Sequence, residues 1–325
     1  MSSLTLYYAQ LYLFKIGGPV LLGLGIIGST LNLLVFTRNA LRKNPCAICF
    51  VAGNIIDLMF LIFTFIPTIF TYGYGIDLAS RNVAVCRSIA YFGFTLSILG
   101  PSYIILASID RTLITSRNAG TRRRSTRRLA ITCIISLAIF WMIFNIHGLI
   151  YMEIFQLAPD YFICIFQPGA YTSFITYWNV IVQGVGPPFL MAIFGIWTIK
   201  HIRQMKNVVH PFSMPTIQTT ATVDRSYSSQ SKDHQLVRML LMEISIYILS
   251  RFPSTIFSIY GQITQYEMKS PEQQLIEQFI TIITYFATFI DSSIGCYTNM
   301  LVSKTFRLEL KRIFFENRFV RIFRP

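Results

Sequence analysis

The sequence predicts an all-helical membrane protein, a bundle of seven transmembrane helices followed by a short amphipathic helix. The first observation is composition: 53% of the 325 residues are hydrophobic and only 13% are charged, with a mean hydropathy of +0.53. The second is that the apolar residues form seven runs, each long enough to cross about 30 Å of hydrocarbon as a helix. Runs of this length are too long for strands, so a transmembrane barrel is excluded.

Short polar segments separate the runs and set the expected boundaries. We expect the spans at residues 16–37, 46–71, 86–113, 129–151, 172–199, 236–260 and 275–301. Residues 1–15 then form an N-terminal segment ahead of the bundle at 16–302. No cleavable signal opens the chain, so we expect the first span to direct insertion. In 303–325, apolar and basic residues alternate at helical spacing, which is typical of a helix on the inner leaflet.

Basic residues favour one orientation of this bundle. Of the 28 Lys and Arg residues, 23 fall in the segments 38–45, 111–128, 200–238 and 303–325, which share one side. An excess of positive charge marks the cytosolic side, so we expect an extracellular N-terminus and a cytosolic C-terminus. The arginines of the second of these segments should meet anionic membrane lipids or a cytosolic protein rather than nucleic acid. The Ser- and Thr-rich segment 207–235 reads as a mobile cytosolic loop.

Two of the six cysteines fall on the outer side of this topology. Cys86 opens the third span and Cys164 lies in the loop after the fourth. A disulfide between them would tether that loop over the outer mouth of the bundle, and two unpaired thiols are the alternative. The remaining cysteines lie within spans or at cytosolic ends, where thiols stay reduced: Cys46, Cys49, Cys133 and Cys296.

Short motifs follow one another along the spans in a characteristic order. They are Gly28-Ser-Thr-Leu-Asn32, Asp57, Cys86 twenty-five residues before Arg111, Asp110-Arg111-Thr112, Trp141, Pro187-Pro188 and Phe252-Pro253. This order and spacing resemble the rhodopsin-like G-protein-coupled receptors over residues 16 to 313. The resemblance implies a plasma-membrane receptor, not an enzyme, that binds an extracellular ligand and activates a heterotrimeric G protein. Ser293-Ile294 and the run from Leu301 to Arg307 look most like invertebrate-type neuropeptide receptors.

The resemblance also implies a switch at the cytosolic end of the third span. There the family holds an arginine with a neighbouring carboxylate, which corresponds to Arg111 and Asp110 in this chain. Asp233, at the start of the sixth span, would be a further partner that clamps spans three and six together. Alternatively, Asp233 is a solvated helix-start residue favoured by the helix dipole. Glu243 is a second acidic candidate for the partner of Arg111.

An arginine, Arg251, interrupts the sixth apolar run, where leaving it unpaired would cost at least about 2.5 kcal/mol. Counting from the span ends places Arg251, Asp57 and Asp291 near the bilayer midplane. In the family, a tryptophan occupies the position of Arg251 and an asparagine commonly occupies that of Asp291. These two positions face each other. We therefore expect a buried ion pair of Arg251 with Asp291, with Asp57 as a second partner and Asn32 in the same polar core. A contact from Arg251 to an acidic ligand is the alternative.

The inner part of the bundle also departs from the family pattern. The motif Asn-Pro-x-x-Tyr of the seventh span becomes Gly295-Cys296-x-x-Asn299, which lacks the tyrosine. A Gly100-Pro101 step is expected to interrupt the third span, and Gly100 removes a hydroxyl that helps the family hold sodium. A receptor that binds its ligand without coupling to a G protein therefore remains an alternative.

Several classes of ligand are excluded or disfavoured. Gly93 stands where amine receptors have an aspartate, and no lysine lies between Pro271 and Ser303 for the Schiff base of an opsin. The chain has no Asn-x-Ser/Thr sequon and a short N-terminus, so a large captured hormone is not supported. We expect a short peptide or a small molecule, with the acidic outer loops favouring a basic peptide. The expected contacts are Phe94, Ser97, Thr255, Ser258 and Tyr285.

Other partners follow from the cytosolic segments, and we expect no cofactor or metal. No Ser or Thr follows Thr305, so kinases and arrestin would have to use the third inner loop. Its candidate sites are Ser213, Thr219, Ser226, Ser228 and Ser229. The rival from another class is a transporter that uses the buried charges as a relay, but the odd number of helices and the lack of inverted repeats argue against it.

Overall fold

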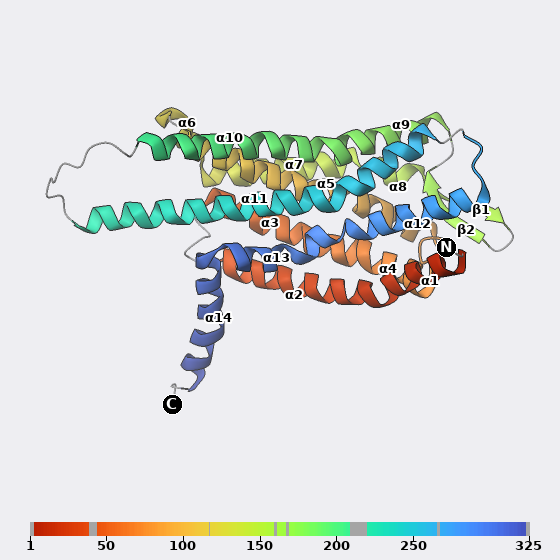
Figure 1. Ribbon diagram of the computed structural model, residues 1–325, viewed down its shortest axis with the longest axis horizontal. Coiled ribbons are helices and arrows are strands. Elements are labelled where there is room, and N and C mark those ends of the chain that lie inside the picture. The colour runs from red at the N-terminus through yellow and green to blue at the C-terminus, as the bar shows by residue number, and fades with distance from the viewer. Residues whose placement is uncertain are drawn as a thin grey trace.

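The structure is a computed structural model that describes residues 3–38, 44–116, 118–158, 161–166, 169–208, 220–264 and 267–322. Long helices run side by side, with a small β-hairpin and the N-terminus at one end and α14 turning away at the other (Figure 1). We call these the hairpin end and the α14 end. Within the described residues, seven helical segments are long and apolar enough to cross a membrane, which confirms the predicted fold: Leu4–Phe36, Pro45–Tyr74, Val83–Ile114, Arg127–Tyr151, Ala170–His201, Gln235–Ile263 and Pro271–Val302.

The first span begins earlier than expected. It consists of α1 (Ser3–Tyr12), a π-helical turn (Leu13–Gly17) and α2 (Gly18–Phe36). The helix was expected from residue 16, yet it begins at Ser3, because residues 4–14 are mostly apolar and include no charge, Pro or Gly. Residues 3–15 therefore continue the first span instead of forming a separate segment.

Asparagine caps begin the next two spans. The second span consists of α3 (Pro45–Phe60), a π-helical turn (Leu61–Phe65) and α4 (Ile66–Tyr74), and the third is α5 (Val83–Ile114). Asn44 and Asn82 each accept a hydrogen bond from a backbone N–H in the first turn of their helix. The expected interruption at Gly100-Pro101 was wrong, because α5 continues through Pro101. That part of the helix is buried, so packing on its neighbours compensates for the missing backbone donor.

The loop after the fourth span contains a hairpin that the sequence analysis did not predict. The chain passes from α6 (Ala119–Arg124), α7 (Arg127–Phe144) and α8 (His147–Tyr151) into β1 (Met152–Ala158) and β2 (Tyr161–Phe166). The two strands pair antiparallel, with Ile154 opposite Cys164. This pairing satisfies the backbone of a loop that would otherwise depend on water.

The remaining helices complete the bundle. They are α9 (Ala170–Asn179), a π-helical turn (Val180–Val185), α10 (Gly186–Val208), α11 (Thr220–Ile263), α12 (Pro271–Ala287), α13 (Ile290–Val302) and α14 (Lys304–Ile322). Residues 220–235, expected to be part of a mobile loop, are instead the first turns of α11. Ser213 and Thr219 lie outside the described residues, as do the side chains of Ser226, Ser228 and Ser229.

Two apolar clusters hold the helices together. One includes Phe36, Tyr247 and Phe306, and the other includes Phe60 and Phe289. The ring of Phe306 packs edge-on against that of Phe36 at 5.9 Å, which attaches α14 to the bundle.

Candidate functional sites

The β-hairpin is fixed over one end of the bundle by two contacts with α5. The predicted disulfide between Cys86 and Cys164 is confirmed. Next to it, Arg87 Nε donates a hydrogen bond of 3.0 Å to the carbonyl of Met152. The loop is thus held across the helix ends, as its cysteines predicted.

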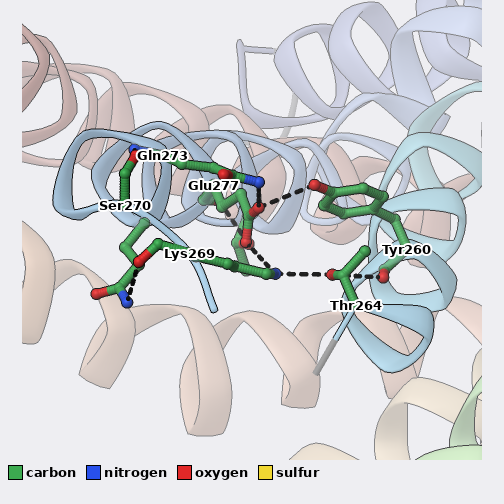
Figure 2. A network of polar contacts seen from close by, with 8 residues as sticks. Tyr260, Thr264, Lys269, Ser270, Gln273 and Glu277 are labelled. Atoms are coloured by element: carbon green, nitrogen blue, oxygen red, sulfur yellow. Dashed lines mark hydrogen bonds and ion pairs between the residues drawn. The ribbon is translucent and has the colours of Figure 1, made fainter. Parts of the chain in front are cut away.

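A polar network joins α11 to α12 at the same end (Figure 2). Lys269 Nζ lies 2.6 Å from Glu277 Oε2 and donates to Thr264 Oγ1 at 2.7 Å. The hydroxyl of Tyr260 and the amide of Gln273 both donate to Glu277 Oε1, at 2.9 and 3.1 Å. Lys269 and Glu277 are only 13% and 18% exposed, so the network fixes the loop between the two helices.

A cavity of about 490 Å³ lies among the helices below the hairpin, and we call it the outer cavity. Met152 of β1 and Gly93 of α5 contribute to its wall. All five side chains expected to contact a ligand line it: Phe94, Ser97, Thr255, Ser258 and Tyr285.

Seven polar residues that line this cavity in the described part of the chain were not predicted from the sequence: Thr64, Thr68, Thr176, Asn179, Gln183, Ser254 and Thr288. Thr64 and Thr68, and likewise Asn179 and Gln183, are pairs four residues apart, so each pair shares one helix face. This spacing of polar residues within apolar runs was the available signal. Ser97 Oγ donates to Gln183 Oε1 at 3.0 Å, which joins α5 to the fifth span.

Arg251 of α11 and Asp291 of α13 lie together beneath the outer cavity. Arg251 Nε and Nη2 are each 3.5 Å from Asp291 Oδ2, and the two side chains are 15% and 13% exposed. These contacts are long, because charge-assisted hydrogen bonds usually measure about 2.7–2.9 Å. The guanidinium also lies over the rings of Phe60 and Tyr247, at 5.4 and 5.6 Å from their centroids, within cation–π range.

The other predicted core residues surround a smaller cavity of about 50 Å³, the inner cavity. Asn32, Asp57, Arg251 and Asp291 all line it, so the structure brings the expected polar core together. Asn32 Nδ2 donates to Asn54 Oδ1 at 2.7 Å, and this partner was missed. The inner cavity touches residues of both apolar clusters, so the polar core lies between them.

Arg111 lies in a compact network near the α14 end of α5. Its Nη2 donates to Asp110 Oδ2 at 2.8 Å and to Asn44 Oδ1 at 2.7 Å, and its side chain is 1% exposed. Ser125 Oγ donates a short hydrogen bond to the other oxygen of Asp110. Asn44 and Ser125 were not predicted from the sequence, although an asparagine before a proline is a recognisable helix start. The side chain of Asp233 lies outside the described residues.

One comparison with known proteins places this geometry in a family. The model of the family described as 7 transmembrane receptor (rhodopsin family) matches residues 28–294, most of the chain. The chain belongs to this family. A search of curated proteins found no match.

Membership of this receptor family establishes the general function of the protein. The receptor is a multi-pass plasma-membrane protein that takes an extracellular ligand and has a G protein as its partner. Proteins of this family are receptors rather than enzymes, which confirms that expectation.

Asn299 and Glu243, two residues that differ from the usual family pattern, form a hydrogen bond inside the receptor. Asn299, where the resemblance places a tyrosine, is fully buried and donates a hydrogen bond of 3.1 Å to Glu243 Oε1. Glu243 also lines the inner cavity. The expectation that Glu243 could pair with Arg111 was therefore wrong, because this carboxyl faces α13 in the middle of the bundle.

Proposed function

We propose that the receptor binds a short neuropeptide in the outer cavity and activates a heterotrimeric G protein at the α14 end. The observation that carries the proposal is the outer cavity itself: its volume of about 490 Å³ is in the range of ligand sites, and all five expected contact residues line it. The resemblance of residues 293–294 and 301–307 to invertebrate-type neuropeptide receptors supports a peptide.

In this proposal the hairpin end faces the outside and the α14 end faces the cytosol. The disulfide of the hairpin suits an oxidising compartment, and most basic residues of the chain lie in the segments at the other end. The basic face of α14 would contact anionic lipids of the inner leaflet.

Coupling would depend on the release of Arg111. Asp110 and Asn44 hold its guanidinium at 2.8 and 2.7 Å in this conformation, in which it is buried. A movement of α11 away from α5 would expose it to a G protein. Asp233 as a further clamp, and the third inner loop as the site for kinases and arrestin, remain parts of the proposal.

A second candidate is a receptor that binds its ligand without coupling. The hydrogen bond between Asn299 and Glu243 favours it, because this bond joins α11 to α13 where the family has a tyrosine that meets the moving helices.

G-protein dissociation in cells, followed by resonance energy transfer and challenged with a panel of short neuropeptides, tests the proposal. We expect a peptide-dependent signal that Arg111→Ala abolishes. Arg123→Ala is the matched control, because Arg123 is an exposed arginine of the neighbouring α6. With equal surface expression of all three proteins, a peptide that binds without signal in any channel would support the second candidate instead.

A further inference from the structure

The outer cavity has an uneven distribution of charge. Arg251 is the one charged side chain among the described residues that line it. The nearby carboxyl groups, those of Asp57, Glu243 and Asp291, line the inner cavity instead. Arg251 lines both cavities, so its guanidinium forms part of the boundary between them.

The hydrogen-bonding capacity of Arg251 is only partly used. A guanidinium has five N–H donors in a planar fork that matches a carboxylate. Its contacts with Asp291 measure 3.5 Å, and its buried Nε makes no hydrogen bond within the described part of the chain. Asp291 Oδ1 likewise has no hydrogen-bond partner there. The ion pair therefore holds the arginine in place but leaves N–H donors of its guanidinium able to bind a better-placed anion.

A neutral hydroxyl group in the wall of the same cavity complements an anion as well. Thr64 Oγ1 is buried, lines the outer cavity and has no partner in the described residues. A carboxylate could accept from this hydroxyl and from the guanidinium together. A cationic group at the same depth would face Arg251 with no lining carboxylate to offset the repulsion.

We infer that Arg251 is an anion-recognition subsite of the outer cavity, and that the ligand of the receptor places a carboxylate on the N–H donors of Arg251 that Asp291 leaves unused. The inference rests on the proposed function, because it assigns a chemical class to the ligand of the same cavity. The acidic residues of the outer loops, such as Asp77 and Glu267, can still attract a basic part of the ligand. A peptide that is basic at one end and enters with a carboxylate first fits both observations.

Matched carboxylates and amides test the inference on the purified full-length receptor. One pair is 3-phenylpropionate and 3-phenylpropionamide, and the other is the peptide Gly-Gly-Phe with a free or an amidated C-terminus. Saturation-transfer NMR measures their binding in detergent micelles. We expect the carboxylate of at least one pair to bind about tenfold more tightly than its amide, since charged hydrogen bonds are the stronger ones. The pair that shows the preference distinguishes a small acid from a peptide terminus.

Three variants assign the preference to Arg251. Asp291→Asn removes the competing carboxylate and should increase carboxylate affinity about threefold to tenfold, as one hydrogen-bonded competitor is lost. The double variant R251Q/D291N, which replaces both members of the ion pair by amides, should bind acid and amide equally. Glu277→Gln is the control, because this carboxylate at the hairpin end does not line the outer cavity.

No carboxylate preference in either pair, or a preference that survives in R251Q/D291N, would overturn the inference. The assay contains no G protein, so this failure is separate from a failure of the proposed function. A peptide-evoked G-protein signal without carboxylate preference would overturn the subsite alone.

Discussion

Arg111 and Arg251, two arginines of the helix bundle with little exposed surface, are held in opposite ways. Arg111 is 1% exposed, and its guanidinium donates to Asp110 and Asn44 at 2.8 and 2.7 Å. Arg251 lies 3.5 Å from Asp291, beside two cavities and with a buried nitrogen that makes no hydrogen bond among the described residues. Burial alone therefore says little about how firmly a charge is fixed. The partners decide whether an arginine is locked in one conformation or can exchange its contacts.

The largest effect should come from Arg251→Leu, which leaves Asp291 charged and without its cation. Removing one member of a buried pair costs about 3–5 kcal/mol, so we expect little of this variant at the cell surface. Arg251→Leu combined with Asp291→Asn should restore most of the expression, because Asp291 no longer carries a charge without its partner. Quantitative surface labelling compares the two, and equal expression of the single and double variants would contradict the pairing.

A smaller effect is expected from Asn44→Ala, which tests the lock around Arg111. This change removes a helix cap and also a hydrogen bond to a charged group. Asn82→Ala is the matched control, because Asn82 caps α5 through the same kind of bond and its side chain makes no hydrogen bond to an arginine among the described residues. The cap is worth about 1 kcal/mol and the charged bond about 2 kcal/mol more, so Asn44→Ala should lower the melting temperature further. Equal melting temperatures of the two variants would mean that Asn44 does not help to hold Arg111 in place.

Ser125→Ala tests the network around Arg111 at its other member, Asp110. Its hydroxyl donates to the Asp110 carboxylate, so its loss should cost about 1 kcal/mol of unfolding free energy. Ser88→Ala serves as the reference, because the hydroxyl of Ser88 bonds only to a carbonyl of its own helix, among the contacts described. Thermal unfolding in detergent measures both, and a difference within error would mean that Ser125 adds nothing to the hold on Asp110.

The smallest effect is expected from Lys269→Met in the network between α11 and α12 (Figure 2). This pair lies near the end of the bundle, where water and salt screen charges more strongly than in the middle. The loss of thermal stability should therefore shrink as sodium chloride is raised, whereas the loss caused by Asn44→Ala should stay constant. A loss of thermal stability that does not depend on salt would mean that the Lys269–Glu277 pair is shielded from solvent as well as the ion pairs of Arg111 and Arg251 are.

The amino-acid sequence was enough to predict the seven spans, and it favoured the Cys86–Cys164 disulfide that the structure contains. The length and hydropathy of each run leave the helix as the only way to satisfy its backbone in lipid. It also placed Arg251, Asp57 and Asp291 at similar depth, because depth follows from counting residues along each helix. Capping residues such as Asn44 were visible in the sequence, but their contacts with other helices were not.

Which side chains meet across helices could be learned only from the packed bundle. The contacts of Asn44 and Ser125 with the Asp110–Arg111 pair, and of Glu243 with Asn299, depend on how each helix is rotated about its axis. That rotation is set by the packing of the two apolar clusters, to which many helices contribute at once. The long contact between Arg251 and Asp291 has the same origin. Depth put the two residues at one level, but packing fixed their 3.5 Å separation and left an arginine facing the outer cavity.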